Sequence, residues 1–272
     1  MLPILLKIGP FTIHTYGVMM AIGVGLALWF ILIHARKQGI NIKILADGAF
    51  YTLLISLVGA KLVLLAAHFS EYISSPAALL SLARSGGVFQ GGLTFGLVFA
   101  LWYFHRYRIP TWKTADIISP GLALGHGFGR LGCFSASCCY GRPSGLPWSV
   151  TFTNPYSHEL TGVPLDLALH PVQLYEAGLN FLNFLILWLI LKKKNFNGQV
   201  FAFYIINYSL IRYFTEFYRG DHSSQTFLIL TSSPYTSLSF PQLFCLLGLI
   251  AGITLFFILR SRRSRGEAVR RS

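Results

Sequence analysis

The chain has 272 residues, of which 54% are hydrophobic and only 11% are charged, and its formal net charge is +13. A soluble domain normally carries about a quarter charged residues, so this composition excludes an ordinary soluble globular protein. The excess of basic residues raises the question of a nucleic-acid partner, which their distribution along the chain answers.

Apolar stretches long enough to form membrane-spanning helices recur along the whole chain. A hydrocarbon core about 30 Å thick requires roughly 20 apolar residues in a helix. In chain order the stretches cover residues 15–34, 44–67, 87–104, 115–134, 173–191, 198–217 and 238–259. The sequence therefore predicts an all-α polytopic membrane protein with about seven transmembrane helices, forming a single membrane-embedded domain over residues 1–272.

Most of the 22 basic residues lie in alternate gaps between these stretches and in the tail of about residues 260–272. Loops rich in lysine and arginine face the cytoplasm, so we expect an external N-terminus and a cytoplasmic C-terminus. The basic tail then sets topology and contacts lipid surfaces, and nucleic acid is not an expected partner. The external segment of about residues 135–172 contains five prolines, which predicts an ordered but mostly irregular segment that shapes access to a site. Residues 219–237 are interpreted as a flexible arm or lid.

Ionisable residues inside membrane helices are costly and usually face a cavity, so they are the first candidates for a site. Arg130 is the strongest, because its planar fork suits a phosphate or a carboxylate and four glycines surround it. The alternative is an arginine that reaches the outer interface. His126 lies four residues earlier and shares its helical face; it is either a base or a hydrogen-bonded core residue. Asp116, at the start of the same helix, is interpreted as complementing that helix's N-terminus.

Further polar residues are predicted in the outer half of the bilayer. Arg212 and Glu216 stand at i, i+4 spacing, which allows an ion pair that is either structural or functional. His170, Gln173 and Glu176 recur at three-residue spacing where the external segment re-enters the membrane. Tyr16 is either a site residue or part of the interfacial aromatic belt, and Arg219 is predicted at the same depth. Lys61 and Gln90 are candidates that could reach the same cavity. Their convergence predicts a site, open to the outer leaflet, that binds an anionic headgroup.

Six motifs in chain order resemble the prolipoprotein diacylglyceryl transferase family of bacterial inner-membrane enzymes. They are "HTYG" (14–17), "GAK" (59–61), "QGGL" (90–93), "GRLGCF…YGR" (129–142), "HPVQLYE" (170–176) and "RYFTEFYRGD" (212–221). The resemblance implies transfer of a diacylglyceryl group from phosphatidylglycerol to the lipobox cysteine thiol of a prolipoprotein signal peptide. A thioether forms and glycerol 1-phosphate leaves. The site would lie toward the outer leaflet among membrane lipids, and neither a metal nor an organic cofactor is expected.

By motif position, the resemblance implies catalytic roles for Arg130, Arg212, Glu216 and Tyr16. It also implies a set of substrate-binding residues. That set comprises Lys61, Gln90, Gly91, Gly92, Gly129, Arg130, Gly141, Gln173, Tyr175, Glu176 and Arg219.

The chain departs from the family signature G-R-x-G-N-F-x-N-x-E-x-x-G at three positions, which hold Cys133, Ala136 and Cys138. Gln90 replaces a histidine sometimes proposed as the base, and glutamine cannot titrate. The candidate replacements are His126, His170 and Glu176; alternatively, the arginine field ionises the acceptor thiol.

The cysteines near the outer end of the fourth stretch allow several interpretations. A disulfide from Cys133 to Cys138 or Cys139 would hold the turn after Arg130, provided that the helix ends near Gly132. Free cysteines are the alternative. A metal site is disfavoured because no flanking tetrahedral set occurs at the usual spacing.

Three other functions remain open. A membrane thiol–disulfide oxidoreductase would use Cys138 and Cys139, but no C-x-x-C motif is present. A lipid or anion transporter would account for intramembrane arginines, but no internal repeat is visible. A diverged family member with another acceptor, or without activity, would account for the altered signature.

Overall fold

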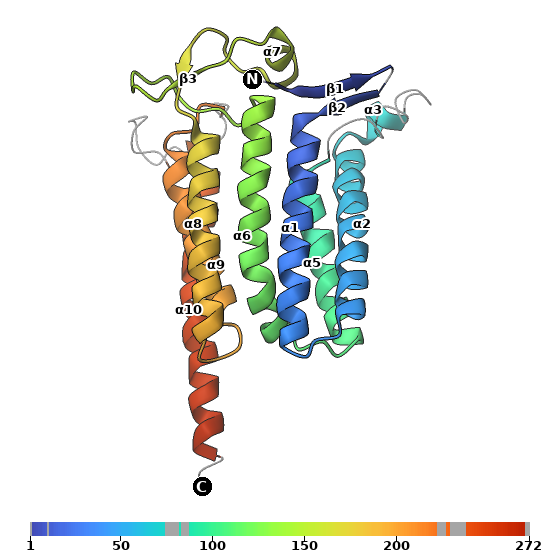
Figure 1. Cartoon of the computed structure of the whole chain (residues 1–272), viewed down its shortest axis with the longest axis vertical. Helices are drawn as coiled ribbons and strands as arrows, with labels where there is room; N and C mark the ends of the chain where they lie inside the picture. The colour runs from blue at the N-terminus through green and yellow to red at the C-terminus, as the bar shows by residue number, and fades with distance from the viewer. Residues whose placement is uncertain are drawn as a thin grey trace. The chain divides into compact units, whose positions relative to one another are not determined.

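The computed structural model of this chain describes residues 2–9, 11–73, 82, 87–221, 227–228 and 238–269. Long helices dominate it (Figure 1). They are α1 (Thr15–Lys37), α2 (Ile42–Ala67), α5 (Phe89–Arg106), α6 (Thr111–Ala136), α8 (Val172–Lys193), α9 (Gln199–Glu216) and α10 (Phe240–Val269). The shorter helices are α3 (Phe69–Ile73) and α7 (Pro155–Thr161).

Three short antiparallel strand pairs complete the described structure. They are β1 (Ile4–Ile8) with β2 (Phe11–His14), β3 (Val150–Thr151) with β4 (Ala168–Leu169), and β5 (Phe227–Leu228) with β6 (Leu238–Ser239). They lie outside the long helices, so the all-α prediction describes the bulk of the fold.

Each predicted apolar stretch falls on one of the long helices. Among the described residues, four helices are long and apolar enough to cross a membrane: Thr15–Lys37, Ile42–Ala67, Val172–Lys193 and Phe240–Arg263. Large apolar side chains are exposed on them, such as Trp29 at 63% and Phe244 at 70%, which suits a lipid-facing surface. A mostly helical membrane protein is therefore confirmed. Seven crossings and the orientation of the termini stay predictions.

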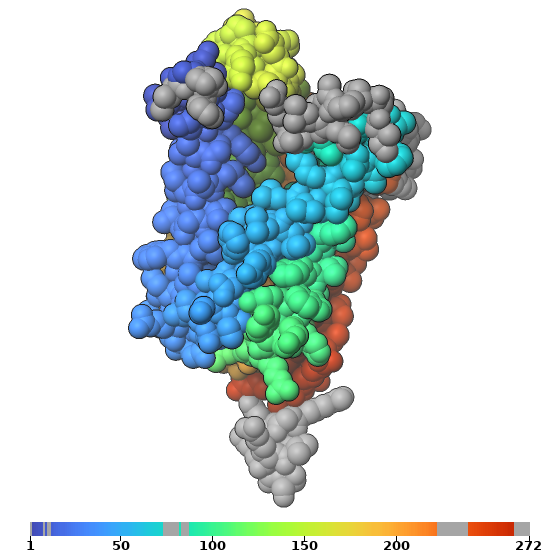
Figure 2. Space-filling view, turned by 90° about the vertical axis from the view of Figure 1, so that its right-hand side faces the viewer, coloured from blue at the N-terminus to red at the C-terminus, as the bar shows by residue number. Residues whose placement is uncertain are grey.

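The chain forms two compact units, one of Leu32–Thr114 and one of Met1–Ile31 with Ala115–Ser272. In the Leu32–Thr114 unit, α2 lies against α5 (Figure 2). A Cβ at Gly48 would lie 2.6 Å from the ring of Tyr103, and one at Gly91 would lie 2.7 Å from the carbonyl oxygen of Gly59. The Tyr103 hydroxyl donates to the carbonyl of Ile44 at 3.0 Å. Small residues thus allow these two helices to approach closely.

Glycines also pack the helices of the Met1–Ile31 and Ala115–Ser272 unit. A Cβ at Gly23 of α1 would lie 3.0 Å from the carbonyl oxygen of Gly125 on α6, and one at Gly127 would lie 2.5 Å from the ring of Phe181 on α8. The glycines around Arg130 therefore bring α1 and α8 close to α6.

Asp116 has a different role from the predicted one. α6 begins at Thr111, so Asp116 lies beyond its first turn and is fully buried. Its carboxylate accepts from the Lys194 Nζ at 2.8 Å and from the backbone N–H groups of Gly198 at 2.8 Å and Phe201 at 3.0 Å. It therefore stabilises the start of α9 and not that of its own helix. The prediction was wrong because the donors come from a distant segment.

The segment of residues 135–172 is ordered and mostly irregular, as predicted. Asn154 caps α7 by accepting from the Tyr156 N–H. Phe152, Val163 and Leu169 form a small buried cluster that gives the segment its own core. Most of the predicted arm at 219–237 lies outside the described residues.

Replacing Asp116 with alanine is expected to lower the free energy of unfolding by about 3–5 kcal/mol, because removing one partner leaves a buried charge unpaired. Thermal unfolding in detergent measures this. The control is Glu159→Ala, at an exposed position, which should change stability by less than about 0.5 kcal/mol. Equal stability of the two variants would contradict the capping role.

Candidate active site

Glu176, on the first turns of α8, lies at the centre of a buried charge network. Its Oε2 pairs with Nε of Arg130 on α6, and its Oε1 lies 3.0 Å from Nη1 of Arg212 on α9. The Thr215 hydroxyl donates to the same Oε1 at 2.9 Å. One carboxylate thus holds arginines from two other helices.

Arg212 extends the network to a second carboxylate. Its Nη2 lies 2.7 Å from Oε2 of Glu216, which confirms the i, i+4 ion pair expected from the sequence. The Ser239 hydroxyl donates to Oε1 of Glu216 at 3.3 Å. Two arginines and two carboxylates compensate one another, as buried charges must.

The carboxylates and the guanidinium groups of this network differ in their exposure to solvent. The side chains of Glu176 and Glu216 are each 2% exposed, whereas those of Arg130 and Arg212 are 13% and 16% exposed. A guanidinium group carries five donors, so each arginine retains capacity for a ligand after pairing. The accessible part of the network is cationic, and it can bind an anion.

His126 lies one turn before Arg130 on α6, as predicted. Its Nε2 accepts a hydrogen bond from Nε of Arg130 at 3.3 Å, and its ring packs 5.3 Å from that of Tyr208. His126 therefore contacts the network directly, and one of its nitrogens already faces Arg130.

Arg219 lies just beyond α9. Its Nε and Nη2 donate to the two Asp221 oxygens at 2.9 and 2.5 Å. Burial by itself would lower the pKa of Arg219, but the hydrogen bonds and charge of Asp221 outweigh burial and raise it. Arg219 therefore stays a cation.

The segment that follows α6 contacts Arg219 and its neighbour Gly220 through the backbone. Gly141 forms an isolated antiparallel bridge with Arg219, and the Gly220 N–H donates to the carbonyl of Tyr140 at 3.0 Å. A Cβ at Gly141 would collide with the carbonyl oxygen of His170. Glycine is required here for close backbone approach.

The "HPVQLYE" motif supports this segment. Gln173 is fully buried, and its Nε2 donates to the carbonyl of Cys138 at 2.8 Å. The Tyr175 hydroxyl accepts from Nε1 of Trp148 at 2.8 Å and lies 3.4 Å from Nδ1 of His170. Gln173 and Tyr175 thus hold in place the segment between α6 and α8, which forms one wall of the candidate site.

Tyr16, at the start of α1, is 42% exposed. A Cβ at Gly132 would lie 3.1 Å from its ring, so the phenol lies against the last turns of α6. The structure therefore places Tyr16 against the helix that carries Arg130, in the same compact unit. Gly129 lies close by on α6, where a Cβ would be 3.3 Å from the sulfur of Met20.

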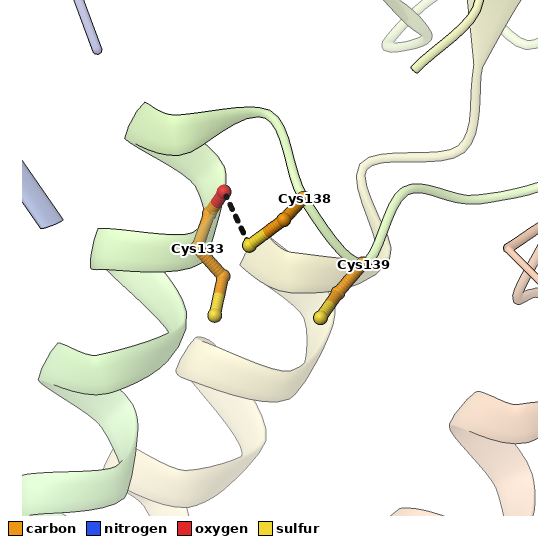
Figure 3. Close-up of side chains that lie close together, drawn as sticks. All are labelled: Cys133, Cys138 and Cys139. Atoms are coloured by element: carbon orange, nitrogen blue, oxygen red, sulfur yellow. Dashed lines mark hydrogen bonds between the residues drawn. The ribbon is translucent and has the colours of Figure 1, made fainter. Parts of the chain in front are cut away.

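Cys133, Cys138 and Cys139 are free thiols. Their sulfur atoms lie within 4.8 Å of one another and face a common space (Figure 3). The predicted disulfide required α6 to end near Gly132. This requirement is not met, because α6 continues to Ala136. The pKa of Cys139 is lowered by hydrogen bonds from the other two thiols and by the charges of Arg219 and Arg130.

Four predicted binding residues belong to the Leu32–Thr114 unit: Lys61, Gln90, Gly91 and Gly92. The Lys61 ammonium donates to the carbonyl of Leu82 at 2.7 Å, and both glycines pack α5 against α2. Their part in substrate binding stays a prediction.

The sequence did not reveal the central pairing. Spacing along one helix indicated Arg212 with Glu216, whereas Glu176 and Arg212 are 36 residues apart. Thr215 and Ser239 were missed as well. The only signal was that Glu176 was predicted at the same membrane depth as the arginines.

Helices apolar enough to cross a membrane describe a multi-pass membrane protein, and the accessible guanidinium groups of the buried network form a candidate site for an anion. The family model described as prolipoprotein diacylglyceryl transferase matches residues 3–258, and the chain belongs to this family.

Relatives from several bacteria have the name phosphatidylglycerol–prolipoprotein diacylglyceryl transferase. That of Clostridium tetani is 32% identical over 97% of this chain and 100% of its own length. That of Bordetella bronchiseptica is 34% identical over 80% of this chain and 82% of its own. That of Pseudomonas paraeruginosa is 31% identical over 93% and 91%.

Gly141→Ala is expected to lower stability by about 1–3 kcal/mol, the usual range for forced overpacking, because the new methyl group meets the His170 backbone. Gly145→Ala is the matched control in the same segment, since a Cβ there meets nothing within 4 Å. Thermal unfolding and limited proteolysis of residues 137–170 measure the difference. Indistinguishable variants would show that the close approach is not required.

Proposed function

We propose that this protein transfers the diacylglyceryl group of phosphatidylglycerol to the lipobox cysteine thiol of prolipoprotein signal peptides. A thioether forms and glycerol 1-phosphate is released. The reaction takes place in the bacterial inner membrane, at a site toward the outer leaflet. Membership of the family and the names of the relatives support the reaction. The observation that carries it is a buried network in which the guanidinium groups are more exposed than the carboxylates.

Arg130 and Arg212 are the proposed headgroup ligands. Phosphatidylglycerol has a phosphodiester anion, and guanidinium groups bind such anions through short, charge-assisted hydrogen bonds. Both arginines keep donors for this purpose while Glu176 holds them in position. The lipid therefore finds cations that are already oriented.

The same arginines stabilise the reaction's charge. The acceptor sulfur attacks the glyceryl carbon next to the phosphate oxygen, a C–S bond forms, and the C–O bond breaks. The electron pair of that bond goes to the departing phosphate, whose negative charge grows in the transition state. Donors fixed in a site of low water content are most effective where charge develops.

The acceptor thiol, with an unperturbed pKa of about 8.5, must also lose its proton. Gln90 has no titratable group, so the proton passes to another acceptor. We propose His126, which contacts Arg130, and His170 as the candidates. Glu176 is the weakest candidate because both of its oxygens already face arginines.

The other predicted residues are proposed to shape the site. Tyr16 and Arg219 complete its polar lining, Glu216 holds Arg212 in position, and Gly129 and Gly141 permit close approach. The remaining residues of the binding set are Lys61, Gln90, Gly91, Gly92, Gln173 and Tyr175.

A diverged member acting on another acceptor is the rival, supported by Cys133, Ala136, Cys138 and Gln90 at positions of the family motifs. To separate the two, the purified protein is incubated with phosphatidylglycerol and a lipobox peptide, and the peptide is weighed by mass spectrometry. A diacylglyceryl mass gain on cysteine is expected, and none on a peptide with serine in its place. No gain from folded, lipid-bound protein would overturn the proposal in favour of the rival.

Arg130→Ala is expected to lower kcat/KM by roughly 100-fold or more, the usual cost of losing a donor to developing charge. Arg130→Lys should recover only part of the loss, because an ammonium lacks the fork that binds two oxygens. The peptide assay measures both, with thermal unfolding to verify folding. Arg106→Ala, at the exposed end of α5, is the control. Full activity in folded Arg130→Ala would refute the assignment.

A further inference from the structure

The three cysteines at the end of α6 have no part in the proposed reaction, yet they are brought together by an unusual backbone. Cys133 lies in the last turn of α6, and Cys138 and Cys139 lie on the segment that follows. Ser137 and Cys139 have φ angles of 62° and 57°, a left-handed conformation that non-glycine residues seldom adopt. This turn reverses the chain and directs all three sulfur atoms into one space (Figure 3).

The separation of the sulfur atoms suits a metal ion. A zinc–sulfur bond is about 2.3 Å long, so sulfur atoms around one ion lie about 3.8–4.0 Å apart in tetrahedral or trigonal geometry. The three Sγ atoms lie within 4.8 Å of one another, so each pair needs to close by less than about 1 Å.

A disulfide fits the arrangement less well. It would require two sulfur atoms about 2.05 Å apart and would leave the third unused. Adjacent residues such as Cys138 and Cys139 have Cα atoms about 3.8 Å apart, closer than the 4.4–6.8 Å usual for a disulfide. A bridge between two of the cysteines would therefore leave the convergence of the third unexplained.

The nearby positive charges and the exposure of the cysteines also favour metal binding. Three thiolates around a divalent ion have a net negative charge, and the positive charges of Arg219 and Arg130 act on Cys139. All three cysteines are partly exposed, so an ion can enter.

We propose that Cys133, Cys138 and Cys139 form a three-thiolate site for a thiophilic metal ion. Thiolates select Zn²⁺ and Cu⁺ among the common ions; Zn²⁺ would take a water as fourth ligand, and Cu⁺ would be three-coordinate. Each thiol releases its proton on binding. The bound ion ties the end of α6 to the segment leading to Gly141. The sequence argued against a metal site because it has no set of four ligands at the usual spacing, but a three-thiolate site does not require such a set.

Metal titration of the full-length protein tests the site. Protein purified in detergent is reduced, freed of metal with a chelator, and titrated with Zn²⁺ against a chelating dye, with Co²⁺ for its thiolate charge-transfer absorption and with Cu⁺ under anaerobic conditions. One ion per chain is expected. Each of Cys133→Ser, Cys138→Ser and Cys139→Ser should weaken binding by about 100-fold or more, beyond the 10–100-fold typical of outer-shell changes. Cys245→Ser, a buried cysteine on α10, is the matched control and should bind as tightly as the unaltered protein.

Thiol alkylation provides a second measurement that needs no variant. Zn²⁺ should protect Cys133, Cys138 and Cys139 from alkylation, as followed by mass spectrometry, and leave the labelling of Cys245 unchanged. Absence of stoichiometric Zn²⁺ or Cu⁺ binding would overturn the proposal. So would undiminished binding by the triple serine variant, or a disulfide between two of the three cysteines that persists in the isolated protein and prevents binding. None of these outcomes depends on the transferase assay.

Discussion

The pairing of Glu176 with two arginines is the interaction on which the rest of the site depends. Removing a guanidinium group from water costs several kcal/mol, and only well-formed ion pairs and hydrogen bonds compensate that cost. Glu176 provides them to Arg130 and Arg212 at once, with Thr215 completing its hydrogen bonds. Because these residues come from α6, α8 and α9, the charge network and the packing of the three helices stabilise each other.

The exposure of the network's groups favours the negatively charged ligand that we propose. The carboxylates are almost completely buried, and the guanidinium groups retain a small exposed fraction. An anion that enters meets oriented donors and has no carboxylate to displace. Preorganisation of this kind is what electrostatic catalysis requires, since the donors need not rearrange as charge moves. The glycines of α6 contribute indirectly, because they let α1 and α8 approach closely enough to fix Arg130 in place.

The segment after α6 connects this network to the irregular segment that follows it. Gln173 holds the carbonyl of Cys138, and Gly141 passes between the backbones of His170 and Arg219. The three cysteines lie at the junction of α6 and this segment, and two of them, Cys133 and Cys138, stand where the family signature has other residues. Polar contacts and a tight backbone crossing hold this segment in place, and the thiolate-bound ion that we propose would add a third connection. This chain has thus retained the arginines and changed what supports them.

Much of the protein could be predicted from the sequence by itself. Runs of apolar residues indicated the long helices, because a single segment that crosses a bilayer must satisfy its own backbone hydrogen bonds and therefore forms a helix. The i, i+4 spacing correctly indicated the ion pair of Arg212 and Glu216. Only the tertiary structure decided the partners of Glu176, the capping of the start of α9 by Asp116, and the convergence of the three cysteine sulfur atoms. These contacts join residues from different helices, or depend on a left-handed turn that no local pattern specifies. Periodicity describes which face of a helix is polar, but the partner across that face is determined by how the helices pack.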